Sequence, residues 1–297
     1  MIGFRRILCP VDFSEFSQHA LSHAAALARR YEGRVTLLYV APLLPSVVTF
    51  PMSVDPLTLD PASREGLWAE LRELAGKLQD EVPMDVALLE GNAARQIVQR
   101  AREGEADLVV MGTHGRSGFE RWVLGSVTEK VLRKAHCPVL TVPPAAGAAA
   151  PGGFRRILCP VDFSPMSNLG VKQALSLAES TKASLTLLHV VQWLPDDEVR
   201  EHRHFDVAGF RAYLERDSLR QLNALVPEAA RDWCAVKEAV VFGKPWGEVL
   251  RRAAEDASDL IVMGVSGRGA VDRMLFGSTT HHVVREAACP VLTVRAA

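Results

Sequence analysis

The chain of 297 residues contains one long segment twice, and this duplication constrains its fold more than any other feature. GFRRILCPVDFS occupies residues 3–14 and returns without change at residues 153–164. A second segment, CPVLTV, closes each half at residues 137–142 and 289–294. Self-similarity of this kind indicates tandem copies of one folding unit.

The two copies are joined by residues 143–152, PPAAGAAAPG, which are small and apolar and include prolines near both ends. Such a stretch is typical of a linker. We therefore expect a first domain at residues 1–142, a linker at 143–152 and a second domain at 153–297. The length is sufficient for two buried cores.

Short apolar runs alternate with helical patterns in each copy, for example residues 6–11 and 107–111 against residues 126–134. This alternation predicts a parallel sheet with helices on both faces. Five strands per copy predict an α/β fold made of two tandem doubly wound domains, each a five-stranded parallel sheet of order 3-2-1-4-5. Ligands of such sheets bind beyond the carboxyl ends of the strands where the order reverses, here between strands one and four.

The fourth strand of each copy leads into a glycine pattern of fixed spacing, G-x2-G-x9-G-S. Glycine lets backbone N–H groups approach a phosphate and adopt positive φ. A helix that starts at the last glycine adds free N–H groups and its positive dipole end. In a single strand–loop–helix unit, glycines often serve only the turn, but duplication with intact spacing favours phosphate binding. The pattern comprises Gly112, Gly115, Gly125 and Ser126 in the first copy and Gly264, Gly267, Gly277 and Ser278 in the second, with Arg116 and Arg268 inside the loops.

The predicted strand order places Asp12, as the only strand-end carboxylate of the first copy, in one crevice with Gly112, and it places Asp162 beside Gly264. A carboxylate accepts hydrogen bonds from ribose hydroxyls or from a base. Val40, at the end of the second strand, is suited to an apolar slot for the base. The alternative role of Asp12 is the N-cap of the first helix, for which Ser14 competes.

These segments resemble the universal stress protein family over essentially the whole chain. The resemblance rests on the opening ILCPVDFS, the DLVVMG and DLIVMG strands, the glycine spacing and the closing CPVLTV. It implies an ATP-binding regulator of the stress response with at most weak hydrolysis. It implies nucleotide contacts from Pro10, Val11, Asp12, Val40, Met111, Gly112, Gly115, Gly125, Ser126 and Val127, and from Pro160, Val161, Asp162, Val190, Met263, Gly264, Gly267, Gly277, Ser278 and Thr279.

The first copy is nearer to the usual pattern, because Thr113-His114 becomes Val265-Ser266 and Val127-Thr128 becomes Thr279-Thr280 in the second. His114 has no counterpart histidine, which favours a hydrogen bond within the loop over a shared catalytic role. Gly243-Lys244-Pro245 lacks the second glycine and the Ser/Thr of a P-loop. We therefore predict no catalytic residue. A slow ATPase or autophosphorylating enzyme, and an interaction module with an empty or non-nucleotide crevice, stay as alternatives.

Two histidine pairs, His202 with His204 and His281 with His282, lack a third ligand, so no protein metal site is expected. Mg²⁺ or another divalent cation would arrive with the triphosphate. The net charge of −1 gives no case for nucleic acid or an anionic membrane. Five cysteines without a CxxC motif indicate free, buried thiols, and with the absence of a signal peptide they predict a cytoplasmic protein.

The last strands, residues 139–142 and 291–294, are short and apolar. Such edges need a cover. We expect the two copies to pack through them as an intramolecular pseudo-dimer, as the family resemblance also implies. A homodimer of the full chain and an unidentified protein partner stay open.

Overall fold

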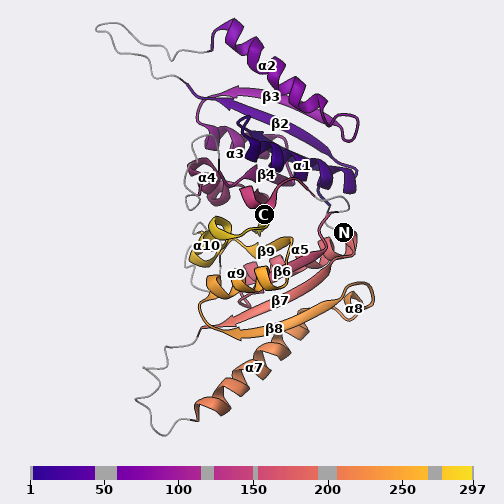
Figure 1. The fold of residues 1–297 in the computed structure, drawn as a ribbon, viewed down its shortest axis with the longest axis vertical. Helices are drawn as coiled ribbons and strands as arrows, with labels where there is room; N and C mark the ends of the chain where they lie inside the picture. Colours follow the sequence, from indigo (N-terminus) through magenta and orange to yellow (C-terminus); the bar gives the residue numbers. More distant parts are fainter. Residues whose placement is uncertain are drawn as a thin grey trace, which may run out of the picture. The chain divides into compact units, whose positions relative to one another are not determined.

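The computed structural model describes residues 3–43, 59–114, 124–149, 153–192, 206–266 and 276–295. The chain divides into two compact units, Gly3–Pro151 and Gly152–Ala296. Each unit is a five-stranded sheet with helices on both faces (Figure 1). The two predicted α/β domains are therefore present, each with its own core.

The strands of the first unit are β1 (Arg6–Val11), β2 (Arg34–Ala41), β3 (Met84–Glu90), β4 (Leu108–Gly112) and β5 (Val139–Val142). Its helices are α1 (Glu15–Arg30), α2 (Pro61–Gly76), α3 (Ala93–Glu103), α4 (Ser126–Lys134) and the 3-10 turn η1 (Pro144–Ala146). The strands of the second unit are β6 (Arg156–Val161), β7 (Ser184–Val191), β8 (Val236–Phe242), β9 (Leu260–Gly264) and β10 (Val291–Val294). Its helices are α5 (Pro165–Thr181), α7 (Val207–Ala224), α8 (Ala230–Trp233), α9 (Pro245–Glu255) and α10 (Ser278–Glu286).

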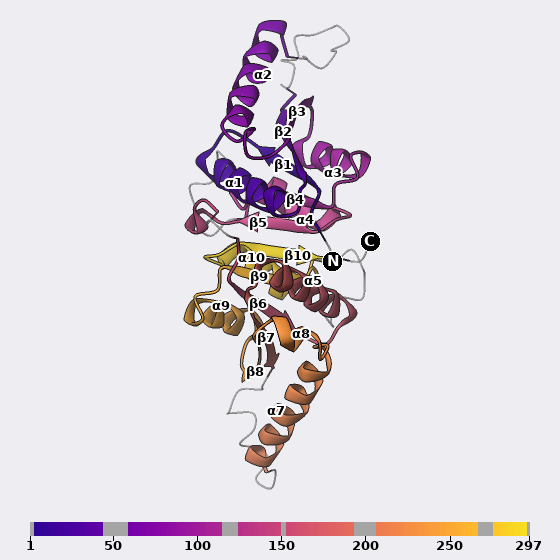
Figure 2. The ribbon, with the colours of Figure 1, turned by 90° about the vertical axis from the view of Figure 1, so that its right-hand side faces the viewer.

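The strand order is β3-β2-β1-β4-β5 in the first unit and β8-β7-β6-β9-β10 in the second, and the pairs within each unit are parallel. The predicted order 3-2-1-4-5 is confirmed for both copies. In the first unit α1 and α2 cover one face of the sheet, and α3 and α4 cover the other (Figure 2). This is the arrangement that right-handed crossovers produce on either side of the reversal point.

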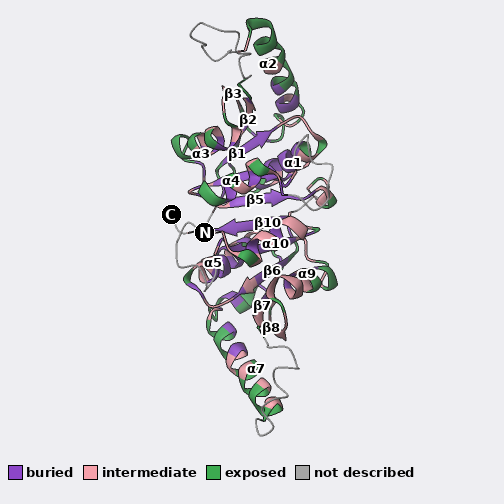
Figure 3. Cartoon of the chain, turned by 90° about the vertical axis from the view of Figure 1, so that its left-hand side faces the viewer, coloured by how far each residue is buried: buried purple, intermediate pink, exposed green. Residues whose placement is uncertain are grey.

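The central strands form the core, as their uninterrupted apolar sequences predict. β4 and β5 are buried along their whole length, and β1 is buried after Arg6 (Figure 3). On α2, Leu71 and Leu74 are buried, whereas Leu67 is only half-buried, so the helix packs on the sheet through the half that contains Leu71 and Leu74.

The first helix of each copy begins directly after a capping serine. α1 begins at Glu15, because the Ser14 hydroxyl oxygen accepts the Ser17 N–H at 3.2 Å and caps the helix. α5 begins at Pro165, since proline is well suited to the first helical position. The short helix α8 was not predicted.

The described part of the segment between the copies, residues 143–149, is bound to the first unit. After the η1 turn, the carbonyl oxygen of Gly147 lies 3.3 Å from Nε2 of His23. The Ala149 N–H donates to the Ser22 hydroxyl oxygen at 3.0 Å. Both contacts are to α1, so this segment packs along that helix.

The cysteines lie within the described residues and are free there, as the sequence predicts. Four of the five are buried as expected, whereas Cys289 is only half-buried. Burial raises the pKa of Cys9 and Cys159 well above the ordinary value, and raises that of Cys289 to about 12. Within the described parts of the chain, every helix is too short or too polar to span a membrane.

Candidate functional site

The candidate site lies where β1 and β4 separate. β1 pairs with β2 as far as Val11↔Tyr39, but its pairing with β4 consists of Ile7↔Leu108 and Leu8↔Val109, although both strands continue. The second unit repeats this, since β6 pairs with β9 only at Ile157↔Leu260 and Leu158↔Ile261. The carboxyl ends of the two central strands are thus not paired with each other at the point where a doubly wound sheet binds its ligand.

Pro10 accounts for this separation. The Arg6 N–H donates to the Asp107 carboxylate at 3.0 Å, and the Arg6 carbonyl accepts the Asp107 N–H at 3.0 Å, so Arg6 directs its backbone groups toward β4. The two-residue period of a strand directs Leu8 and Pro10 the same way. Proline has no N–H, so the ladder toward β4 cannot continue there. Pro160 has the same place in β6, where Arg156 makes the same two bonds to Asp259.

Asp12 follows β1 and is held by the residue that caps α1. Its Oδ1 accepts the backbone N–H of Ser14 at 3.1 Å and the Ser14 hydroxyl at 2.5 Å. Ser14 is therefore the helix cap, and Asp12 forms the turn before it. Asp162 likewise accepts the Ser164 N–H at 3.0 Å, and Ser164 caps α5.

Between the aspartate and the capping serine lies a phenylalanine in a left-handed conformation, with φ of 64° at Phe13 and 61° at Phe163. This conformation costs a bulky residue about 1–2 kcal/mol. The Phe13 ring packs on Tyr39 with centroids 4.8 Å apart, and the Phe163 ring packs on His189 at 4.5 Å. Such aromatic pairs contribute about 0.5–1.5 kcal/mol, which offsets much of that cost. The sequence did not single out these phenylalanines, although each lies directly between the two polar residues.

The described glycines of the pattern lack the positive φ that was expected, so that part of the expectation is wrong, but close packing disfavours a side chain at Gly112, Gly125 and Gly264. Neither Gly112 nor Gly264 has a positive φ, and φ is −56° at Gly125 and −63° at Gly277. A Cβ on Gly112 would lie 3.1 Å from the His114 carbonyl oxygen, and one on Gly264 would lie 2.8 Å from the backbone of Met166. Gly115, Arg116, Gly267 and Arg268 lie outside the described residues.

The helix after the loop starts without a side-chain cap in both units. The Gly125 N–H donates to the Thr113 carbonyl at 2.9 Å, and the Thr128 hydroxyl donates to the Gly112 carbonyl at 2.9 Å. Gly277 and Thr280 make the same bonds to Val265 and Gly264, both at 3.0 Å. No side chain bonds the first turn of α4 or α10 from the cap position, so its N–H groups suit an anion. Thr128 and Thr280 are buried, and no role was predicted for them from the sequence. The pattern that could have identified them is a threonine two residues after each Gly-Ser pair.

The other predicted residues differ in how they could contact a ligand. Val11, Val161, Met111 and Met263 are buried. Val40 and Val190 are half-buried, and Val127 and Thr279 are half-buried on the first turns of α4 and α10. Ser126 and Ser278 are exposed.

One strand-end carboxylate was missed, because β3 extends to Glu90. Its side chain lies 3.4 Å from Arg64 of α2 and accepts the N–H of Leu59 at 3.3 Å. The expectation that Asp12 is the one strand-end carboxylate of the first copy is therefore wrong. Glu90 ends the outermost strand, away from the β1–β4 separation.

His114 makes the hydrogen bond expected of it in the loop, since its Nδ1 lies 2.9 Å from the Thr113 hydroxyl. Its ring lies 6.3 Å from that of Phe16. In the second unit His282 stacks on Trp246 at 4.8 Å and lies 3.3 Å from Glu286. The described residues contain no group of three potential metal ligands, and His202 and His204 fall outside them.

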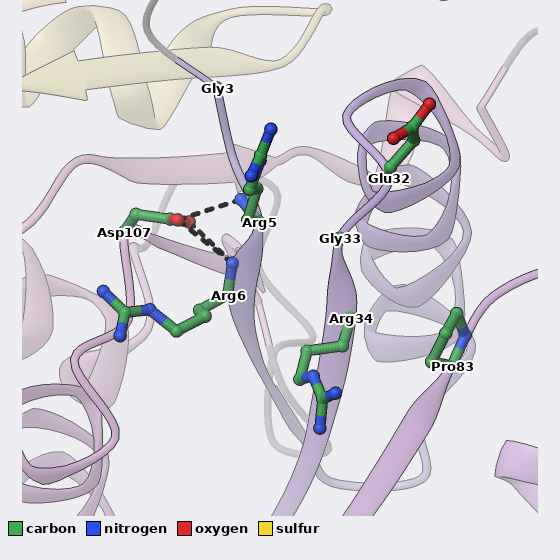
Figure 4. Close-up of a pocket in the computed structure, with 8 residues that line it drawn as sticks. All are labelled: Gly3, Arg5, Arg6, Glu32, Gly33, Arg34, Pro83 and Asp107. Carbon is green, nitrogen blue, oxygen red and sulfur yellow. Dashed lines mark hydrogen bonds between the residues drawn. The ribbon is translucent and has the colours of Figure 1, made fainter.

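A cavity of about 440 Å³ lies at the opposite edge of the first sheet, at the amino ends of β1 and β2 (Figure 4). Figure 4 shows the Asp107 carboxylate directed at the backbone N–H groups of Arg5 and Arg6, which donate to it at 2.9 and 3.0 Å. Burial raises the pKa of Asp107, and these bonds oppose the shift. The guanidinium of Arg6 pairs with Glu105 and that of Arg34 with Asp85. The side chains of Arg6 and Arg34 at this end of the sheet thus already have acidic partners, and this end is separate from the predicted site.

Comparison with known proteins places these features in one family. The family model described as "Universal stress protein family" matches residues 3–143 and 153–295. A universal stress protein of Methanocaldococcus jannaschii is 37% identical over 152 residues, which are 47% of this chain and 82% of that relative. One from Mycolicibacterium smegmatis is 26% identical over 301 residues, covering 97% of this chain and 96% of the relative.

The crystal structure of a universal stress protein from Archaeoglobus fulgidus has the same fold, with a TM-score of 0.69 and 22% identity over 98% of both chains. The family model accounts for both copies, and a relative of matching length covers nearly the whole chain. The chain therefore belongs to the universal stress protein family, as a member with two tandem copies of the domain.

Proposed function

We propose that the chain binds ATP at the carboxyl ends of its central strands and acts as a nucleotide-dependent regulator in the stress response. The observation that carries the proposal is the repeated arrangement at these ends. In each unit the two central strands part at a proline, an aspartate follows the first strand, and an uncapped helix starts after the second. A nucleotide needs such a combination of a hydroxyl acceptor and phosphate donors.

In this proposal the nucleoside and the phosphates have separate contacts. Asp12 accepts from the ribose or base, Val40 lines the base slot, and the backbone of Pro10 and Val11 forms its floor. The N–H groups of Ser126 and Val127 donate to the phosphates. The first site is completed by Met111, Gly112, Gly115, Arg116 and Gly125. The equivalent second site comprises Pro160, Val161, Asp162, Val190, Met263, Gly264, Gly267, Arg268, Gly277, Ser278 and Thr279.

A divalent cation such as Mg²⁺ would be held mainly by the triphosphate, because Mg²⁺ keeps several waters and few protein ligands. We propose a cytoplasmic location and a role in which the bound nucleotide, and not its turnover, is the signal to a protein partner. We also propose that the two copies form a pseudo-dimer through β5 and β10. Both strands are apolar and come last in the order of their own sheets.

Binding is tested by mass spectrometry of small molecules released from the purified chain and by calorimetric titration with ATP. We expect weaker binding in D12A and in D162A, and binding in the millimolar range in the double variant. Failure to find adenine nucleotide, together with no binding at millimolar ATP, would contradict the proposal. A labelled-phosphate release assay separates the regulator from a slow ATPase, for which D12A would abolish measurable turnover.

The pseudo-dimer has its own test, which is charged substitution at Leu140 and Leu292. We expect small-angle scattering to show a more extended chain after both substitutions, because an apolar contact between the strands would be lost. An unchanged scattering curve would contradict this assembly.

A further inference from the structure

We propose that Phe13 is a positioning residue for the nucleotide site, and that Phe163 has the same role in the second unit. In each case a ring contact holds a left-handed turn that directs the adjacent aspartate toward the nucleoside. The inference rests on the proposed ATP function and assigns a residue to it that contacts no ligand itself.

The turn is fixed on both sides of Phe13. On one side β1 ends at Val11, which is in register with Tyr39 of β2. On the other side Ser14 caps α1 and donates its N–H to Asp12 at 3.1 Å. Phe13 joins these two fixed points with φ of 64°, and its ring packs on Tyr39, the register partner of Val11.

The second unit keeps the geometry although the partner ring is different. Phe163 has φ of 61° and packs on His189, which is in register with Val161. The Nδ1 atom of His189 lies 2.7 Å from the carbonyl oxygen of Val161, which fixes the imidazole beside the strand end. Both units therefore share an aromatic ring near the carboxyl end of the second strand, and a phenylalanine with left-handed φ packs on this ring.

This geometry links the ring to the carboxylate. The bond from the Ser14 N–H to Asp12 forms across the residue Phe13, so its length depends on the φ of Phe13. Left-handed φ is unfavourable for a residue with a Cβ unless its surroundings hold it there. Without the ring contact the turn can relax to negative φ, which moves the Ser14 N–H and releases the Asp12 side chain.

The test uses the full chain with D162A as the parent, so that the first site dominates ATP binding. We expect F13A to weaken ATP binding about tenfold, because the strain stays and the ring contact is lost. F13G is expected to weaken binding as well. Glycine adopts left-handed φ without strain, but it has no ring to hold the turn in that conformation. F13Y keeps the ring and is the matched control, with affinity within about twofold of the parent.

A double-mutant cycle separates positioning from general packing. If Phe13 acts through Asp12, F13A will cause no further loss of affinity in a D12N, D162A chain, in titrations extended to millimolar ATP. Thermal unfolding of each variant reports whether the fold is kept. F163A in a D12A parent repeats the test at the second site.

Two results would overturn the inference alone: F13A binding as tightly as its parent, or F13A weakening binding equally with and without the Asp12 carboxylate. Absence of ATP binding by the D162A parent and by the wild-type chain would overturn the proposed function, and this inference with it.

Discussion

Thr128 donates its hydroxyl proton to the carbonyl oxygen of Gly112 at 2.9 Å, which ties the first turn of α4 to the end of β4. Thr280 makes the equivalent bond to Gly264 at 3.0 Å. Both threonines are buried, so neither carbonyl can easily exchange this bond for one to water. The N–H groups at the start of each helix are thus held at a fixed place relative to the strand end.

Thr128→Val should therefore destabilise the first unit and weaken ATP binding. Valine keeps the shape of the side chain but cannot donate a hydrogen bond to the Gly112 carbonyl. Leaving this buried carbonyl without its donor lowers the free energy of unfolding by about 1–3 kcal/mol. Urea unfolding and ATP titration measure the two effects. Thr128→Ser keeps the hydroxyl and is expected to retain most of the ATP affinity. Equal affinity of the valine and wild-type chains would show that the bond does not position the helix.

Gly264→Ala should destabilise the chain more than Gly112→Ala. The added Cβ would lie 2.8 Å from the backbone of Met166 at Gly264, but no closer than 3.1 Å to any backbone atom at Gly112. Backbone cannot move as a side-chain end can, so we expect a loss of about 1–3 kcal/mol at Gly264 and less at Gly112. Urea unfolding monitored by circular dichroism gives both values.

Gly66→Ala is the control for these substitutions, because Gly66 lies in α2 and a Cβ there meets nothing within 4 Å. Alanine in an exposed helix is more favourable than glycine by about 0.5–1 kcal/mol. If alanine stabilises the chain at Gly66 and destabilises it at Gly264, the lost stability at Gly264 results from the close contact of the added Cβ with the Met166 backbone. Similar effects at all three positions would contradict that explanation.

The strand order and most strand limits could be predicted because each central strand is an apolar run that the repeat shows twice. β1, β5 and β10 have the predicted limits, and so does α4. The start of α1 could not be predicted from apolar spacing, since a serine cap and not a hydrophobic residue determines it.

The candidate site lies at the strand ends that the sequence indicates, but the backbone packing and the turn geometry at these ends could not be predicted. The glycine spacing identified Gly112, but the sequence does not show that a Cβ at this position would lie 3.1 Å from the His114 carbonyl oxygen. Likewise, φ at Phe13 depends on the fixed ends of a turn formed by β1 and α1. Both features arise from tertiary packing, which local patterns do not report.

The cysteines of the folded chain should resist a thiol reagent at pH 8. Burial raises the pKa of Cys289 to about 12, and that of Cys9 and Cys159 further, so only about 1 in 10⁴ of the Cys289 thiols is ionised at this pH. We expect all five thiols to react quickly in denaturant and slowly without it. Rapid labelling of Cys289 in the folded chain, located by peptide mass spectrometry, would contradict this.

The stability of the first unit should fall on acidification because of His23. Burial lowers the pKa of His23 to about 4, against about 6.5 in an unfolded chain. The folded state therefore binds fewer protons than the unfolded state between these values. The contribution of neutral His23 is fully present above pH 6.5 and is lost as pH falls toward 4, by up to about 3 kcal/mol.

His23→Gln is the matched control, because Gln173 is the buried residue at the same place in α5. Urea unfolding at about pH 7, 6, 5 and 4 should show a smaller acid loss in the variant, with the difference growing below about pH 6.5. Other groups titrate in this range, but they are common to both chains and cancel in the difference. Parallel stability curves for the two chains would exclude His23 as the source of the acid loss.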